Sequence, residues 1–185
     1  MYCKKYSIYK ANKIASKNSP YYWDLKKEKT KSQFDLFSKF DSFDKKHYKI
    51  LYNYCKKKKI EFMSTPFDEP SLDFLCEIGT EILKVASFDL GNLPFLNKFK
   101  ATKKPLVISV GGGQEQHIKS SMDLLQDCDI AVLHCVSEYP CEYNRLGLSS
   151  IKELKKSYPE VSVGLSDHFN GTLSGPIAYF AGARV

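Results

Sequence analysis

The sequence lacks long apolar runs, and nothing in its 185 residues approaches the roughly 20 apolar residues of a membrane-spanning helix. Its start, MYCKKYSIYK, also lacks the apolar core of a signal peptide. Arginine, the side chain that most often contacts nucleic-acid bases, occurs only twice. These absences predict a cytoplasmic protein that binds neither membranes nor nucleic acid. Intrinsic disorder is excluded, because 43% of the residues are hydrophobic and 14% are aromatic.

The six cysteines include no CxxC pair, which is the spacing typical of many zinc and redox sites. Cys76 and Cys135 lie inside apolar runs, where a reduced thiol packs as a small hydrophobic side chain. We therefore predict six free thiols and no zinc site.

Lysines are concentrated in residues 1–60, which hold 17 lysines and 5 acidic residues, whereas residues 61–185 hold 11 basic and 16 acidic residues. The lysines alternate with aromatic residues at helical spacing, as in KSQFDLFSKF (31–40) and KKHYKILYNYCKKKK (45–59). This pattern favours the solvated faces of amphipathic helices over a nucleic-acid surface. Anionic small molecules stay open as ligands.

Short apolar runs recur from residue 60 onward at intervals of 22 to 32 residues, and each ends in small or polar residues. The runs are IEFMST (60–65), ILKVAS (82–87), PLVISV (105–110), DIAVLHC (129–135) and VSVGLS (161–166), with a weaker candidate at 4–10 and a strand beginning at 182–185. Most runs are followed by a helical pattern, such as the stripe of Ile118, Met122 and Leu125. This alternation predicts an α/β protein with parallel strands.

Helix ends are also indicated by the sequence. A helix is expected over 44–59, and Ser71 is the expected N-cap of the next helix, with Gly79 as its stop. Ile151 and Leu154 mark a later helix that Pro159 closes.

A doubly wound sheet and a (β/α)8 barrel both fit this order of elements. Polar residues at the ends of the runs favour the barrel, because a barrel gathers the carboxyl ends of its strands into one ring. These residues are Ser64, Thr65, Ser87, Ser109, His134, Ser166, Asp167 and His168. A complete barrel needs about 250 residues, so we expect a barrel truncated at both ends.

Several of these residues suggest an anion site. Lys84 lies inside an apolar run, where an ammonium group needs an anionic partner. Ser109 precedes Gly111–Gly113 and a helix, an arrangement that exposes backbone N–H groups to an anion. His168, next to Asp167, is a candidate metal ligand or general base.

The other histidines favour structural readings. His134 is flanked by apolar residues and is expected to be a hydrogen-bonded core residue. His47 and His117 have Lys- or Gln-rich helical surroundings and are expected on the surface.

Five motifs together resemble the sialic acid synthase family: STPFD (64–68), KVAS (84–87), ISVGG (108–112), LLQDCDIAVLHCVSEYP (124–140) and VGLSDH (163–168). The resemblance runs from about Lys5 to Val185. It implies condensation of phosphoenolpyruvate with an N-acetylmannosamine-type sugar to a sialic-acid-like nonulosonic acid and phosphate. It also implies that residues 1–185 are a partial TIM-barrel synthase domain, with about strands 2 to 7 plus the start of strand 8, and that the family's C-terminal antifreeze-like (SAF) domain is absent.

The resemblance also assigns roles. Asp89 and Lys84 match catalytic positions, with Asp89 at the place of a family carboxylate. The residues matching groups around phosphoenolpyruvate are Lys5, Thr65, Ser87, Ser109 and Ser166. Ser137 and Tyr139 match sugar-binding positions. His168 matches one of two histidines that hold a divalent metal, usually Mn²⁺, and the second is expected beyond Val185.

Because that histidine and the first strand have no counterpart here, we expect the 185-residue chain to be weakly active or inactive alone. The full-length protein is expected to be a homodimer acting on phosphoenolpyruvate and an N-acyl hexosamine. Two alternatives stay open: a related synthase with a sugar-phosphate acceptor, and a non-catalytic remnant or anion-binding module.

Overall fold

The structure, a computed structural model, describes residues 3–41 and 43–185, with the backbone alone for residues 3–6. It has an α/β fold in which every strand pairing in the described ranges is parallel. The chain divides into two compact units, one up to Thr80 and one from Glu81 onward.

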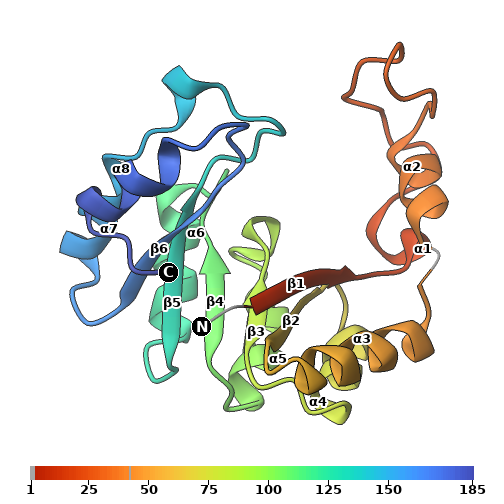
Figure 1. The fold of residues 1–185 in the computed structure, drawn as a ribbon, viewed down its shortest axis with the longest axis horizontal. Helices are drawn as coiled ribbons and strands as arrows, with labels where there is room; N and C mark the ends of the chain where they lie inside the picture. Colours follow the sequence, from red (N-terminus) through yellow and green to blue (C-terminus); the bar gives the residue numbers. More distant parts are fainter. Residues whose placement is uncertain (1–2, 42) are drawn as a thin grey trace. The chain divides into compact units, whose positions relative to one another are not determined.

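The N-terminal unit contains a two-stranded parallel sheet and four helices (Figure 1). The elements are β1 (Cys3–Ile8), α1 (Ala11–Ile14), α2 (Gln33–Phe40), α3 (Lys45–Lys57), β2 (Glu61–Pro66) and α4 (Glu69–Glu77). The strand register runs from Cys3 opposite Glu61 to Ile8 opposite Pro66. The weaker strand candidate at 4–10 is therefore confirmed as a strand that begins one residue earlier and ends two residues earlier.

Aromatic contacts join α3 to its neighbours in this unit. Tyr52 meets Phe62 of β2 edge-to-face at 5.8 Å, and Tyr48 meets Phe74 of α4 at 6.4 Å between ring centroids. The buried Tyr48 donates its hydroxyl hydrogen to the Ser7 carbonyl at 2.7 Å. The lysines of α3 are exposed, so the predicted amphipathic helix over 44–59 is confirmed.

The predicted N-cap of α4 is wrong. The cap is Asp68, whose carboxylate accepts a hydrogen bond from the Ser71 backbone N–H at 2.8 Å, and the helix begins at Glu69. Pro70 fits the first turn of a helix, because those N–H groups have no intrahelical partner. The sequence Asp-Glu-Pro before the apolar run was the signal for this earlier start. Gly79, with φ +89°, follows the helix as expected.

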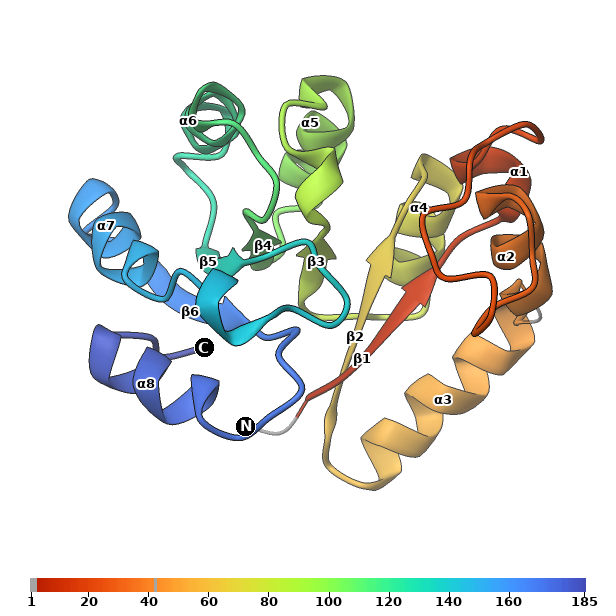
Figure 2. The same cartoon turned by 90° about the horizontal axis from the view of Figure 1, so that it is seen from above.

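The C-terminal unit is a four-stranded parallel sheet in the order β3-β4-β5-β6, with the strands adjacent as they follow in sequence. Its strands are β3 (Leu83–Val85), β4 (Leu106–Ser109), β5 (Ile130–Cys135) and β6 (Ser162–Ser166). Its helices are α5 (Leu93–Ala101), α6 (Glu115–Leu124), α7 (Ser150–Ser157) and α8 (Ser174–Ala181), with short 3-10 helices at Ser87–Asp89 and Tyr143–Arg145. Figure 2 shows α5, α6 and α7 along one face of this sheet.

Apolar side chains of successive strands and helices form the core of this unit. Val85, Ile108 and Val132 lie on neighbouring strands and are fully buried. Ile151 of α7 and Ala178 of α8 pack in one cluster with residues of β6 and the chain end. Tight packing of this kind fixes the positions of the strand ends, where the polar residues lie.

The predicted strand beginning at 182–185 has partial support. Arg184 donates its backbone N–H to Val163, and the Val185 carbonyl accepts from Leu165, both at 2.8 Å. These residues therefore line the edge of β6 without forming a regular strand.

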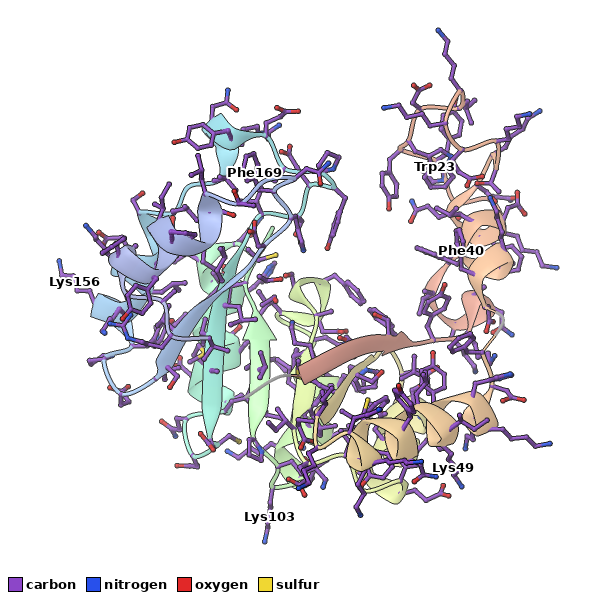
Figure 3. All side chains as sticks on the ribbon, in the orientation of Figure 1. Trp23, Phe40, Lys49, Lys103, Lys156 and Phe169 are labelled. Atoms are coloured by element: carbon purple, nitrogen blue, oxygen red, sulfur yellow. The ribbon has the colours of Figure 1, made fainter. Side chains whose placement is uncertain are left out.

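Because the four strands are parallel, all of their carboxyl ends lie at one edge of the sheet. Figure 3 labels one residue at each end of the unit. Phe169 lies in the loop after β6, and Lys103 lies in the turn before β4. The predicted site residues of this unit lie in the last residues of its strands or in the loops that follow them.

No helix within the described ranges is long and apolar enough to cross a membrane. The thiols of Cys55, Cys128, Cys135 and Cys141 are free, which confirms the prediction for these four of the six cysteines. The side chain of Cys3 lies outside the described residues.

Candidate functional site

Lys84 is the central charged residue at the carboxyl ends of β3 and β4. It lies within β3 and is 2% exposed. Its ammonium donates hydrogen bonds to Ser109 Oγ at 2.7 Å and to the Val85 carbonyl at 2.6 Å. An ammonium in this setting makes charge-assisted hydrogen bonds, which offset part of its desolvation. The expected partner of Lys84 was an anion, but these two partners are a neutral hydroxyl and a carbonyl.

Ser87 connects the end of β3 to the turn after β4. Its hydroxyl accepts a hydrogen bond from the Gly111 N–H at 3.1 Å. A Cβ atom at Gly111 would lie 2.8 Å from the Cys135 carbonyl oxygen and 2.9 Å from Ser137 Oγ. Gly111 is therefore required by the close approach of the loop after β5.

The expected cluster of exposed glycine N–H groups is wrong for two of the three glycines. The Gly111 N–H is bonded to Ser87, and the Gly113 N–H is bonded to the Val110 carbonyl at 3.4 Å. The glycines serve close packing instead, since a Cβ at Gly113 would meet Leu90 Cδ1 at 2.6 Å.

Asp89 is a buried carboxyl group in the turn after β3, with 4% of its surface exposed. Its Oδ2 has no hydrogen-bond partner in the described structure. Burial raises the pKa of this carboxyl to about 6, although a hydrogen bond with Asn92 and the charge of Lys84 both lower it. The group can therefore exchange a proton near neutral pH.

His168 is the histidine of the loop after β6. Its Nδ1 lies 2.6 Å from the Val136 carbonyl oxygen in the loop after β5. A carbonyl only accepts hydrogen bonds, so Nδ1 carries the hydrogen and Nε2 keeps the lone pair. The imidazole stacks at a tilt on the Tyr139 ring, with 4.0 Å between centroids.

The remaining predicted residues of this unit lie around His168. Tyr139 is 75% exposed and precedes Pro140 through a cis peptide bond. Ser137 is also exposed, and Ser166 is half-buried opposite Cys135 at the end of β6. The structure thus brings the residues after β5 and β6 together, next to the Gly111 turn.

His134 is separate from this group. It is buried within β5, and its Nε2 bonds the Leu146 carbonyl oxygen at 2.7 Å. The prediction of a hydrogen-bonded core histidine is confirmed.

Several residues that hold these loops by hydrogen bonds were not predicted from the sequence. Ser174, buried at the start of α8, donates a short hydrogen bond to Asp167, and the Cys141 N–H donates to the His168 carbonyl at 2.9 Å. Ser121 of α6 holds the turn after Asp89 by accepting from the Gly91 N–H at 3.0 Å. The partners of Cys141 and Ser121 are distant in sequence, which leaves little local signal.

His168 is the one predicted metal ligand among the described residues. His168 Nε2 has the lone pair that a metal ligand needs. However, the described residues contain no group of three or more His, Cys, Asp or Glu that could hold a metal ion. These residues do not make a metal site by themselves, and the Mn²⁺ site stays a prediction.

Two predicted phosphoenolpyruvate ligands belong to the N-terminal unit. Thr65, at the end of β2, is 2% exposed, and its hydroxyl has no hydrogen-bond partner in the described structure. The backbone of Lys5 pairs with Met63 in β1, while its side chain lies outside the described residues. The roles of both stay predictions.

Comparison with known proteins adds to this geometry. The chain is 34% identical to the N,N'-diacetyllegionaminic acid synthase of Campylobacter jejuni subsp. jejuni serotype O:2 over 98% of its own length and 56% of the relative's. It is 33% identical to the N-acetylneuraminate-9-phosphate synthase of Drosophila melanogaster over 77% of its length and 39% of the relative's. The chain spans about half the length of such curated relatives.

A solved structure supports the same relationship. The crystal structure of the N-acetylneuraminic acid (sialic acid) synthetase of Leptospira borgpetersenii serovar Hardjo-bovis, in complex with citrate, is 32% identical, with a TM-score of 0.84. That match covers 97% of this chain and 59% of the synthetase chain. The NeuB family profile itself matches residues 2–185, nearly the whole sequence. The resemblance found in the five motifs is therefore confirmed, and the chain belongs to the NeuB family.

Proposed function

We propose that this chain is the barrel part of a nonulosonic acid synthase that joins phosphoenolpyruvate to an N-acyl hexosamine of the N-acetylmannosamine type. Its strands would belong to a (β/α)8 barrel. The observation that carries the proposal is the electrostatic interaction between two buried groups in or just after β3: the ammonium of Lys84, and the carboxyl group of Asp89, whose Oδ2 has no hydrogen-bond partner in the described structure. A cation and a proton carrier are the two groups that this condensation needs beside its anionic substrate.

The chemistry divides between these groups. The methylene carbon of phosphoenolpyruvate attacks the sugar aldehyde and forms the carbon–carbon bond. The electron pair of the carbonyl π bond moves to the aldehyde oxygen, which takes up a proton and becomes a hydroxyl, and positive character is left at the phosphate-bearing carbon. Water adds to that carbon, its proton passes to a base, and the carbon–oxygen bond to phosphate breaks. Asp89 is the proposed base, because a carboxyl group with a pKa of about 6 is largely ionised at neutral pH.

The residues around Lys84 would hold the anionic substrate. Its ammonium, fixed by Ser109, offsets the charge of the phosphate and carboxylate without reorganisation. Ser87 and Ser166 would add hydroxyl donors. Preorganised donors are effective because their orientation is fixed before the substrate binds.

The loops after β5 and β6 would bind the sugar. Ser137 offers an exposed hydroxyl, and the exposed ring of Tyr139 offers an apolar surface with a polar tip. His168 Nε2 would accept a hydrogen bond there or contribute one ligand to a metal ion. No reaction step is assigned to a metal here, since the described residues do not complete its site.

The test is binding of phosphoenolpyruvate to the chain, measured by isothermal titration calorimetry. Lys84→Met should weaken binding by about 10- to 100-fold, the worth of a charged hydrogen bond. Lys156→Met is the matched control, since Lys156 is an exposed lysine of α7 (Figure 3). Equal binding by both variants, or no binding by the wild-type chain, would refute the proposal.

Phosphate release provides the second measurement. Release from phosphoenolpyruvate by the full-length protein should require an N-acyl hexosamine, and Asp89→Asn should abolish it without abolishing phosphoenolpyruvate binding. Release at the same rate without any sugar would contradict the proposed reaction.

A phosphorylated acceptor is the second candidate, because the Drosophila relative is named an N-acetylneuraminate-9-phosphate synthase. N-acetylmannosamine and its 6-phosphate, compared as acceptors, separate the two possibilities. We expect the unphosphorylated sugar to be preferred.

A further inference from the structure

The loop after β6 is anchored by the carboxylate of Asp167. Its Oδ1 accepts a hydrogen bond from the Phe169 N–H at 3.0 Å, and its Oδ2 accepts the short hydrogen bond from Ser174 Oγ. Ser174 is the first residue of α8 and is 1% exposed. Because α8 packs on β6 and α7, the carboxylate fastens the loop to a rigid part of the unit.

The same loop is fastened from the other side by the loop after β5. The Cys141 N–H donates to the His168 carbonyl at 2.9 Å, and Cys141 forms an isolated parallel bridge with Phe169. The imidazole itself bonds the Val136 carbonyl through Nδ1. That last bond depends on the loop keeping its position to within a few tenths of an ångström.

We propose that Asp167 and Ser174 are positioning residues that hold His168 in the Nδ1–H tautomer, so that Nε2 presents its lone pair to a ligand at the carboxyl ends of β5 and β6. The neutral imidazole has two tautomers, and the hydrogen bond made by one nitrogen decides which form is present. The role of Nε2 in contacting the sugar substrate or its metal rests on the proposed function. The tautomer of His168 does not depend on that function.

The geometry makes a sharp prediction for the two buried or half-buried histidines of this unit. His168 should carry its hydrogen on Nδ1, since that atom faces Val136 O. His134 should carry it on Nε2, because that atom lies 2.7 Å from Leu146 O. Long-range ¹H–¹⁵N NMR of the imidazole nitrogens distinguishes the forms, at a pH well above the usual pKa of imidazole.

Ser174→Ala tests the role of the clamp. Loss of one net hydrogen bond should shift the His168 tautomer ratio by about five-fold toward Nε2–H, with the His134 signals unchanged. Ser121→Ala is the matched control, because Ser121 is a buried serine with two hydrogen bonds elsewhere in the same unit. It should leave the His168 ratio as in the wild type.

Asp167→Asn is a second variant in case Ser174→Ala does not fold, which loss of the His134 signals would reveal. The amide keeps one acceptor oxygen for two donors, so it should shift the ratio in the same direction. The proposal is wrong if His168 is already Nε2–H in the wild type, or if a folded variant keeps it wholly Nδ1–H. If the ratio shifts while the chain fails to bind phosphoenolpyruvate, the clamp stands and the proposed function fails.

Discussion

The carboxyl ends of β3 and β4 differ in construction from those of β5 and β6. At β3 and β4, the polar groups of Lys84, Ser109 and Asp89 are buried. At β5 and β6, Tyr139 and Ser137 are exposed and His168 is partly so. Both ends belong to one sheet, so the difference comes from the loops and the side chains that they carry.

This contrast suggests that the two ends suit different kinds of ligand. A buried charge interacts strongly with a ligand, but its desolvation costs stability. The buried groups at β3 and β4 therefore suit an anion of fixed shape. Exposed groups on loops interact more weakly and adapt more readily, which suits an acceptor that varies within a family. This division is wrong if variants at the exposed end lower the stability more than variants at the buried end do.

The largest expected effect comes from Gly111, where the two ends meet. Gly111→Ala should lower the free energy of unfolding by about 2–3 kcal/mol, because the new Cβ overlaps the Cys135 carbonyl. Gly175→Ala is the matched control, since a Cβ there meets nothing within 4 Å. Urea denaturation of both variants gives the measurement. Equal stability of the two would show that the loops move apart at little cost.

Removing one serine hydroxyl from each end compares the ends directly. Ser109→Ala should cost about 1–3 kcal/mol, since it removes a hydrogen-bond partner of a buried ammonium. Ser137→Ala should change stability by less than about 0.5 kcal/mol, because Ser137 is exposed. Thermal unfolding of the pair checks the ranking, and the reverse order would contradict the division.

The stability of the protein should depend on pH through the buried carboxyl group of Asp89. Its pKa rises from 3.8 to about 6 on folding, so ionisation is penalised in the folded state. The contribution of Asp89 to stability should therefore be greatest below pH about 4 and be lost as pH rises through 6. Asp89→Asn lacks this loss and should be more stable above pH 6 by about 1–2 kcal/mol, after allowance for solvent screening.

Unfolding measured from pH 4 to 7 checks the sign. The exposed Asp73 of α4 supplies the control variant, Asp73→Asn. Its stability relative to wild type should not rise with pH. A difference between Asp89→Asn and wild type that shrinks with rising pH would mean that the carboxylate is stabilised in the fold.

Much of the fold could be predicted from the sequence, because the strands are short apolar runs bounded by polar residues. The run at 129–135 became β5 at Ile130–Cys135, and the run at 161–166 became β6 at Ser162–Ser166. Helix α8 was missed, since Gly175 and Pro176 argue against a helix by composition. Their place in its first turn makes them tolerable there.

The site was less predictable than the fold, because its contacts join residues far apart in sequence. Lys84 was recognised from its apolar neighbours, but its partner Ser109 lies 25 residues away. The exposed glycine amides were expected from a local pattern, and the bond from Gly111 to Ser87 overturned that expectation. Local sequence indicated where polar residues gather, whereas tertiary structure decided which atoms stay available.

The smallest effect on stability is expected at Tyr139, because its side chain is largely exposed. Tyr139→Ala should change the free energy of unfolding by less than about 0.5 kcal/mol. If the ring contacts the sugar, the same change should weaken binding of the N-acyl hexosamine by about two- to ten-fold, the worth of an aromatic contact. Tyr22→Ala is the control, since Tyr22 is 73% exposed in the N-terminal unit. Calorimetric titration with sugar separates the two variants, and equal affinities would remove Tyr139 from the proposed sugar side while leaving the buried anion side untouched.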